Sequence, residues 1–255
     1  MELGGNSFAD LLGASEIGYK SVTLLPHPLV SSGAHSKEQN LPTRKQTYDS
    51  PRQLARRASI LEATRDLLSK HGYDGTTVRD VAELAGVAKG TLYNIYGGKD
   101  ELIFAAVNDV RADVFDRTMD LGPSPGIDII LKANEAVCEE VVRTPLYTEA
   151  ISRALFGPSP AKMLIPSLVE FPINHTRDEL EMAARLGQIE SGIDTAQLAR
   201  HLVMQRWGII IGWTLGQISI DDVTREVKQA TVRTLQSVAL PDTRAMLESY
   251  LHDSK

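Results

Sequence analysis

Apolar residues return every three or four positions from Pro51 onward, which is the spacing of a helix that buries one face. Ile60, Leu67 and Leu68 carry this pattern, and charged residues lie between them. The pattern predicts a helix that runs from near Pro51 to Gly72, where the permissive glycine backbone favours a stop.

A short helix is predicted next, because Thr77, three residues before an aspartate, has the spacing of an N-terminal capping pair. Gly86 is suited to end that helix in the left-handed conformation. Residues 88–95 then have the pattern of a second short helix, with Leu92 and Ile95 on its inner side. Two short helices joined by a tight turn are therefore expected.

Longer helical segments fill the rest of the chain. A helix is expected after Gly97-Gly98, and the helical period resumes beyond the Gly- and Pro-rich residues 122–126. No stretch alternates with a period of two for long enough to predict a strand. The sequence therefore predicts an all-α fold. The later helices are expected at residues 127–143, 146–156, 160–187, 194–217 and 220–239.

Charge is distributed unevenly along the chain. The formal net charge is −6, but residues 44–99 contain ten Lys and Arg against six Asp and Glu, a net of +4. Residues 1–43 contribute −2 and residues 100–255 contribute −8. A basic segment joined to an acidic body indicates that this segment meets an anionic partner. Within it, Arg56 and Arg57 are either solvated surface residues or contacts to that partner.

The composition favours a soluble, cytoplasmic protein. The single cysteine, Cys138, excludes an intramolecular disulfide framework and a cysteine-rich metal site. The longest uncharged apolar run, residues 207–220, has fourteen residues, fewer than the roughly 20 that span a bilayer. No basic run precedes an apolar stretch at the N-terminus, so neither a secretory signal nor a membrane partner is expected.

The two short helices have the pattern of a helix-turn-helix, whose second helix fits the major groove of DNA. Lys89 can pair with a phosphate or a guanine edge, and Thr91 and Tyr93 can donate hydrogen bonds to phosphate oxygens. Gly90 leaves room for the backbone to approach the duplex. Free N–H groups at the start of the following helix favour an anion, and Lys99 adds a positive charge there.

The same segment resembles a known family. Residues 56–107 are similar in order and spacing to the DNA-binding domain of TetR-family transcriptional regulators. The resemblance implies a helix-turn-helix domain followed by a helical ligand-binding and dimerisation domain, whose sequence varies too widely to identify the ligand. The matching features are a helix ending in His71-Gly72-Tyr73, the TTVRDVAELAGV run at 76–87, GTLY at 90–93, and then Tyr96 and Lys99.

Three regions are expected on this basis. Residues 1–50 lack periodicity and are predicted to be a mostly disordered extension, unless Arg44 and Lys45 form an arm that reaches toward DNA. Residues 51–100 are predicted to be the DNA-binding domain, with the motif at about 77–96, and residues 101–255 the effector-binding and dimerisation domain. The predicted DNA contacts are Thr77, Lys89, Gly90, Thr91, Tyr93, Asn94 and Lys99.

Three positions depart from the family's pattern. Ala88 stands where the family often has Ser or Thr, so the second short helix lacks a side-chain cap worth ~1 kcal/mol. Ile95 stands where the family often has a histidine that helps to bind phosphate, and Asn94 is the neighbour that can substitute for it. The Gly97-Gly98 turn is looser than the usual turn and is expected to make the step into the next helix more mobile.

A glycine pattern in residues 207–217 indicates close helix packing. Gly208, Gly212 and Gly216 are four residues apart and would share one helix face, although glycine costs roughly 1 kcal/mol relative to alanine inside a helix. This face is predicted to pack in a homodimer as part of a four-helix bundle, or else against another helix of the same chain. The expected partner stripe on the last helix consists of Val223, Val227, Ala230, Thr234 and Val238.

An effector pocket is predicted among four large residues of the body, Tyr147, Phe171, His175 and Trp207. The same side chains also suit an ordinary helical core, and His175 suits a surface position. The sequence contains no recognisable metal-ligand cluster and no nucleophile–base pair, so no metal, cofactor or enzymatic activity is predicted.

The leading hypothesis is a homodimeric repressor that binds a pseudo-palindromic operator in double-stranded DNA and is released by a small-molecule effector of unknown identity. Two alternatives remain. One is a DNA-binding factor without such an effector, with an architectural or cell-division role, which a body without a cavity would favour. The other is an enzyme with an incidental helix-turn-helix, which turnover of a candidate metabolite would favour.

Overall fold

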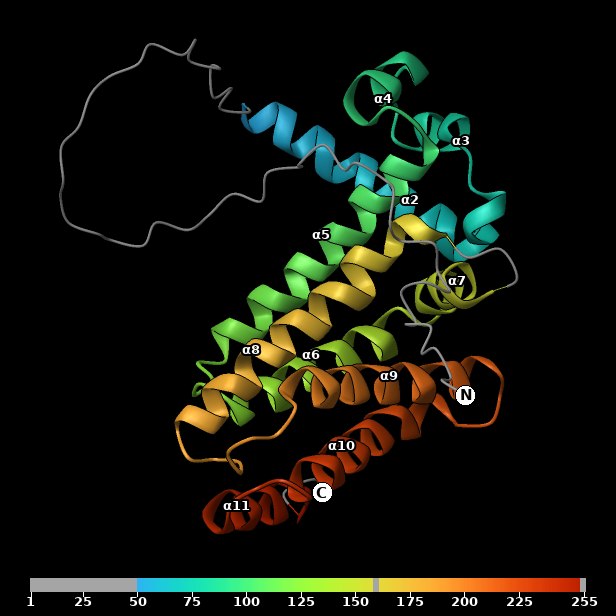
Figure 1. The fold of residues 1–255 in the computed structure, drawn as a ribbon. Helices are drawn as coiled ribbons and strands as arrows, with labels where there is room; N and C mark the ends of the chain where they lie inside the picture. Colours follow the sequence, from blue (N-terminus) through green and yellow to red (C-terminus); the bar gives the residue numbers. More distant parts are fainter. Residues whose placement is uncertain (1–49, 158–160, 253–255) are drawn as a thin grey trace, which may run out of the picture. The chain divides into compact units, whose positions relative to one another are not determined.

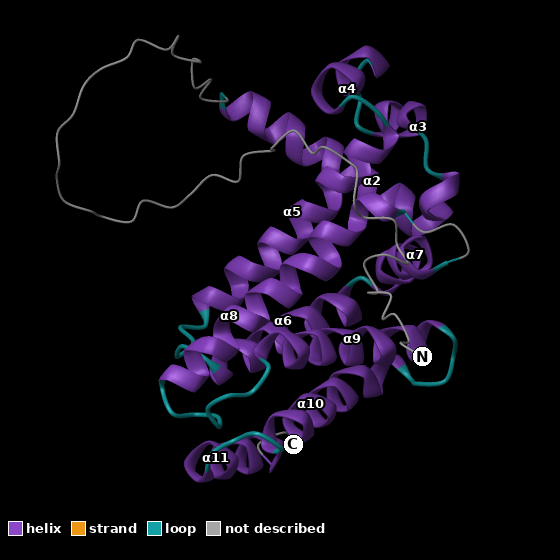
Figure 2. Ribbon diagram, in the orientation of Figure 1, coloured by secondary structure: helices purple, strands orange, loops and turns teal. Residues whose placement is uncertain are grey.

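The fold is all-α, as predicted: Figure 2 shows helices joined by loops, and residues 50–157 and 161–252, which the computed structural model describes, contain no strand. An isolated antiparallel bridge links Ile189 and Ala239. The elements are α2 (Pro51–Gly75), α3 (Val78–Leu84), α4 (Lys89–Tyr96), α5 (Lys99–Asp120), α6 (Ile127–Arg143), α7 (Pro145–Phe156), the 3₁₀ turn η1 (Lys162–Leu164), the π turn η2 (Pro166–Glu170), α8 (Phe171–Arg185), α9 (Thr195–Thr214), α10 (Ile220–Gln236) and α11 (Pro241–His252).

Local sequence explains where the first helices begin and end. The Ser50 side chain accepts a hydrogen bond from the Gln53 backbone, and the Gln53 side chain accepts one from the Ser50 backbone, so a capping box starts α2. Thr77 caps α3 as predicted. Gly72 interrupts α2 at φ +69°, and Gly86 follows α3 at φ +64°, the left-handed conformation predicted for it.

The N-terminal helices enclose a small core of their own. It combines residues of α2, α3, α4 and the first turn of α5, and we call it the small core. α3 packs on both α2 and α4, which fixes the pair of short helices to the longer ones (Figure 1). The small core consists of Ile60, Ala63, Leu67, Val78, Val81, Ala82, Leu92 and Leu102.

The body buries two larger apolar clusters. One joins α5, α6, α7, α9 and α10 and also receives Leu68 from α2. The other joins α6, α8, α9, α10 and α11. α10 packs against both α6 and α9, α8 packs against α9, and α2 packs against α7 (Figure 1). Because α5 places Leu102 in the small core and Ile103 and Val107 in the first large cluster, it connects the two parts.

Two helix predictions were wrong. The helix expected at residues 160–187 is divided into η1, η2 and α8, because Pro166 and Pro172 each lack the N–H that an uninterrupted helix needs. The segment after residue 239 was not assigned to a helix, yet α11 begins there with Pro241 at its first position, where the missing N–H has no helical partner in any case.

The predicted region boundaries stay predictions. Residues 1–49, and with them Arg44, Lys45 and the predicted disordered extension, lie outside the described residues. The predicted boundary between residues 100 and 101 falls in the first turn of α5. Over residues 50–157 and 161–252, every helix is too short or too polar to cross a bilayer.

Candidate nucleic-acid interface

One side of α4 anchors it to the small core. Leu92 is 1% exposed there, and Tyr96 is partly buried against the same residues. Ile95, which was predicted to face inward, is 37% exposed, so that prediction was wrong. Tyr96 lies four residues after Leu92 and therefore shares its face of the helix, and its ring occupies the inner position instead.

The opposite side of α4 is open. Lys89, Gly90, Tyr93 and Asn94 are exposed, with Tyr93 exposed to 45%. The Lys89 ammonium lies 5.5 Å from the centre of the Tyr93 ring, one helical turn away, so the cation and the phenol occupy the same face. No atom lies within 4 Å of a Cβ placed at Gly90, so nothing covers the backbone there. This face presents a cation, a phenol and an amide to any molecule that approaches it.

Thr91 and Thr77 already have partners within the chain. Arg56 Nη2, on α2, donates to Thr91 Oγ1 at 3.3 Å. Thr77 Oγ1 accepts from the Asp80 backbone N–H at 3.2 Å and donates to Asp80 Oδ2 at 2.7 Å. Thr77 therefore positions the start of α3, and Arg56 lies beside α4. The hydrogen bond identifies Arg56 as a neighbour of α4. The two residues are 35 positions apart, so their spacing in the sequence does not reveal this contact.

Lys99 holds the start of α5 against the end of α2. Its Nζ donates to the Asp74 backbone oxygen at 3.1 Å and lies 5.1 Å from the centre of the Tyr73 ring. The Tyr73 hydroxyl donates to Asp100 Oδ1 at 2.7 Å, and burial together with this hydrogen bond raises the pKa of Tyr73. The phosphate contact predicted for Lys99 therefore has to compete with bonds inside the chain.

Replacing Lys99 with Ala is expected to weaken binding to all DNA sequences alike and to lower the slope of log affinity against log salt by about 1 for each half-site. Fluorescence anisotropy over a salt series measures both quantities. Lys132→Ala, on α6, is the matched control and should leave the slope unchanged. A loss restricted to certain sequences, with the parent's salt slope, would contradict a phosphate contact.

The ends of α4 show how this chain departs from the usual family pattern. Ala88 precedes the helix and makes no side-chain capping hydrogen bond. Gly97 follows the helix at φ +94°, a conformation that residues with a Cβ rarely adopt. The mobility expected of this turn stays a prediction.

The four predicted pocket residues lie in different surroundings. Tyr147 and Trp207 belong to the first large cluster, and Trp207 Nε1 donates to the Leu168 backbone oxygen at 3.2 Å. Phe171 and His175, both on α8, lie parallel with ring centres 6.1 Å apart, and Phe115 of α5 packs edge-on against each. Of the four, Tyr147 lines a large cleft. Their role in effector binding stays a prediction.

The predicted dimer surface needs correction. α9 ends at Thr214 and Gly216 lies beyond it at φ +73°, so the three glycines do not share one helix face. A Cβ at Gly212 would meet Ile218 of the same chain at 3.0 Å. Val223 and Val227 are fully buried in the first large cluster, because their stripe of α10 faces the chain's own core.

Part of that prediction stays open. No atom lies within 4 Å of a Cβ placed at Gly208, which is exposed on α9. Ala230 and Thr234, on the neighbouring α10, are partly exposed, and Thr234 Oγ1 donates to Gln205 Oε1 of α9 at 3.2 Å. Together with Gly216, which is exposed beyond the end of α9, these residues are the part of the predicted surface that a second copy can reach.

Taken together, a capped α3, a left-handed turn and an α4 that is anchored on one side and open on the other define a helix-turn-helix DNA-binding protein. Residues 60–106 match the family model described as bacterial regulatory proteins, tetR family. The resemblance to TetR-family transcriptional regulators that the sequence indicated is therefore confirmed over this segment, and curated regulators are similar to the chain.

Individual relatives support this assignment. The transcriptional repressor KstR of Rhodococcus jostii (strain RHA1) is 38% identical over 106 residues, which cover 40% of this chain and 48% of KstR, so the chain spans about half the length of that relative. The transcriptional regulator UidR of Escherichia coli (strain K12) is 25% identical over 181 residues, or 68% of this chain and 87% of UidR. The fatty acid degradation regulator FadR of Bacillus halodurans shares the fold, with a TM-score of 0.62 at 16% identity over 71% of this chain and 98% of FadR.

Proposed function

We propose that this protein is a homodimeric repressor that binds a pseudo-palindromic operator and leaves it when a small molecule binds to its body. The exposed face of α4, with Lys89, Tyr93 and Asn94 on a family-matched helix-turn-helix, is the observation that carries the proposal. We propose repression because the similar protein KstR is named a transcriptional repressor. In this proposal α4 enters the major groove, Lys89 contacts a base edge, and Tyr93 contacts the backbone.

Two copies are proposed because one recognition helix reads too few base pairs for a specific site. A two-fold dimer places two such helices about 34–36 Å apart, one turn of DNA, and its operator is correspondingly an inverted repeat. The surface proposed for this contact combines Gly208 with Ala230 and Thr234. Gly208 is suited to it because the missing side chain allows a close approach between helix backbones.

Gly208→Trp is expected to weaken dimerisation by at least about tenfold, since a bulky ring on this face would prevent close approach. Helix content should be unchanged, because a Cβ at this position meets open space. Gly208→Ala, which adds a single methyl group, is the matched control and should remain dimeric. Sedimentation equilibrium measures the dimer affinity. A Gly208→Trp protein with the parent's affinity would place the dimer surface elsewhere.

The proposed function is tested by selecting fragments of the source genome with the purified protein. The recovered fragments should share a motif made of two inverted half-sites, and adding the protein should reduce transcription from a promoter that contains the motif. Recovery of fragments without a common motif would contradict the proposal.

A further inference from the structure

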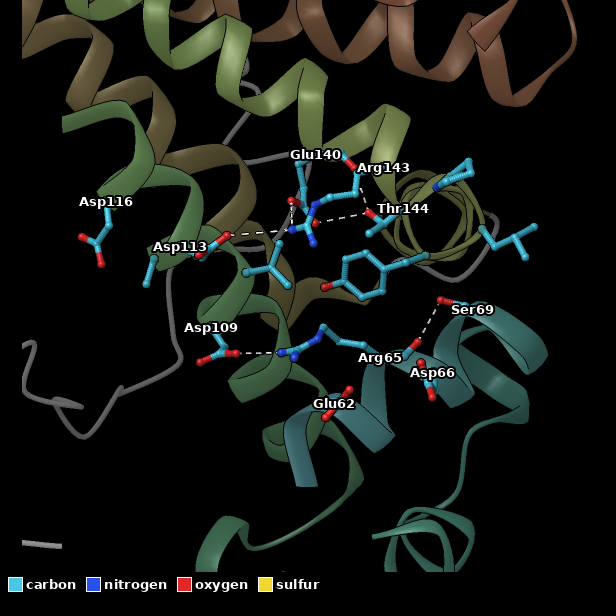
Figure 3. A pocket seen from close by; sticks show the side chains of 15 residues that line it. Glu62, Arg65, Asp66, Ser69, Asp109, Asp113, Asp116, Glu140, Arg143 and Thr144 are labelled. Carbon is cyan, nitrogen blue, oxygen red and sulfur yellow. Dashed lines mark hydrogen bonds and ion pairs between the residues drawn. The ribbon is translucent and has the colours of Figure 1, made fainter. Parts of the chain in front are cut away.

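A cleft of about 790 Å³ lies where the N-terminal helix meets the body, and Figure 3 shows the side chains that line it. One wall is α2, and the others are α5, the end of α6 and the start of α7. Its volume falls within the range of about 300–1,000 Å³ that is typical of small-molecule sites. Because α2 also supplies the small core that carries α4, the cleft lies between the body and the helices proposed to hold DNA.

The cleft is strongly acidic. Arg65 on α2 forms an ion pair with Asp109 on α5 at 2.7 Å. Arg143 forms an ion pair with Glu140, also on α6, and Figure 3 shows both pairs. Of the six acids that line the cleft, Glu62, Asp66 and Asp116 are exposed and make no ion pair with any residue that the structure describes. The six are Glu62, Asp66, Asp109, Asp113, Asp116 and Glu140.

Tyr147 supplies a second, independent observation. Its side chain is 8% exposed and lines the cleft, and its hydroxyl has no hydrogen-bond partner among the described residues. The ring is buried, whereas the hydroxyl oxygen is reached from the cleft, so a molecule bound there can contact it. Burial raises the pKa of Tyr147, so the group stays a neutral phenol at pH 7, and its oxygen can accept a hydrogen bond from a donor inside the cleft.

The arrangement does not suit a metal ion. Within the part of the chain that the structure describes, no three His, Cys, Asp or Glu side chains lie close enough together to hold one. Carboxylates that are separated from one another suit a ligand whose positive charges are separated as well. Between them, Pro145, Leu146 and Val110 line the cleft with apolar surface that a hydrocarbon chain can cover.

We propose that this cleft binds a flexible organic polycation, a diamine or polyamine, with its ammonium groups beside Glu62, Asp66 and Asp116. One ammonium N–H donates to the Tyr147 hydroxyl oxygen, and the methylene chain covers Leu146 and Pro145. Such a ligand contacts α2 together with α5 and α7, so its affinity depends on how α2 sits against the body. On this basis, which rests on the proposed function, the cation is the effector that shifts the position of the DNA-binding helices.

The test uses the full chain and spermidine, with binding followed by isothermal titration calorimetry at fixed ionic strength. Saturable binding of one spermidine per chain is expected. The double variant Glu62→Gln and Asp116→Asn should bind at least tenfold more weakly, and Tyr147→Phe, which keeps the ring, several-fold more weakly. Glu248→Gln, an exposed acid on α11 outside the cleft, is the matched control and should bind like the parent.

Magnesium chloride at the same ionic strength should not compete with spermidine. Competition by magnesium, absence of saturable binding, or parental affinity in the double variant would overturn the proposal. The double variant changes two exposed side chains and keeps the test valid if Tyr147→Phe fails to fold.

DNA binding is measured separately, so that the two proposals can fail separately. Spermidine should release the parent from its selected DNA more readily than it releases the double variant, a comparison that cancels the direct effect of spermidine on DNA. If the protein binds DNA sequence-specifically but does not bind spermidine, only the proposal that the cleft binds a polyamine is contradicted. A protein that binds spermidine but no specific DNA contradicts the proposed function.

Discussion

Replacing Asn134 with leucine is expected to lower the free energy of unfolding by roughly 3–5 kcal/mol, because it leaves a buried charge without its acceptor. Arg206 is buried in the body, and its Nη1 donates to Asn134 Oδ1 at 2.6 Å. Asn134 Nδ2 in turn donates to Thr231 Oγ1 at 3.0 Å. No carboxylate of the described residues forms an ion pair with Arg206, and burial lowers the pKa of this guanidinium.

Two further variants separate this effect from a general loss of packing. Asn134→Asp keeps an acceptor and adds a counter-charge, so it should cost less than Asn134→Leu. Thr231→Val removes only the far end of the network and should cost about 1 kcal/mol. Urea unfolding followed by circular dichroism measures all three. An Asn134→Leu protein as stable as the parent would show that Arg206 does not depend on Asn134.

Lys89→Ala is expected to weaken operator binding by about 1–3 kcal/mol for each half-site, or roughly 2–6 kcal/mol for a dimer that uses two. Lys89 lies at the first position of α4, the end of the recognition helix that contacts base edges in this motif. Because its side chain is exposed and packs only over the Tyr93 ring, the change should leave folding intact. Anisotropy titrations against the selected operator measure the loss, and circular dichroism checks the fold. Unchanged affinity would exclude a base contact by Lys89.

Helix positions were predictable wherever local signals agreed. The helix expected at residues 127–143 coincides with α6, because Gly126 precedes it and the apolar period is regular throughout. The prediction of one helix at residues 160–187 was wrong. The apolar period continues past Pro166 and through η2, although the backbone there has the hydrogen bonds of a π-helix. α11 was missed although Pro241 marks a helix start, since the pattern after it is short.

The functional surfaces were predictable to different degrees. The open face of α4 depends on eight consecutive residues, so its exposed side chains could be proposed from sequence, although the choice of Tyr96 over Ile95 for the inner side could not. The period of Val223 and Val227 identified a buried stripe, but a period does not tell whether a stripe meets its own chain or a second copy. The acidic cleft combines residues of α2, α5, α6 and α7 whose individual positions look like ordinary solvated surface, so only their arrangement in space reveals it.

Binding-site selection from random DNA, run side by side on the parent, Lys89→Ala and Tyr93→Phe, tests most directly the claim that α4 reads the operator. The parent should select two inverted half-sites. Lys89→Ala should lose the preference for one base in each half-site, whereas Tyr93→Phe should keep every base preference and bind more weakly overall. If both variants keep the parent's preferences and affinity, α4 is not the reading helix and the account is wrong.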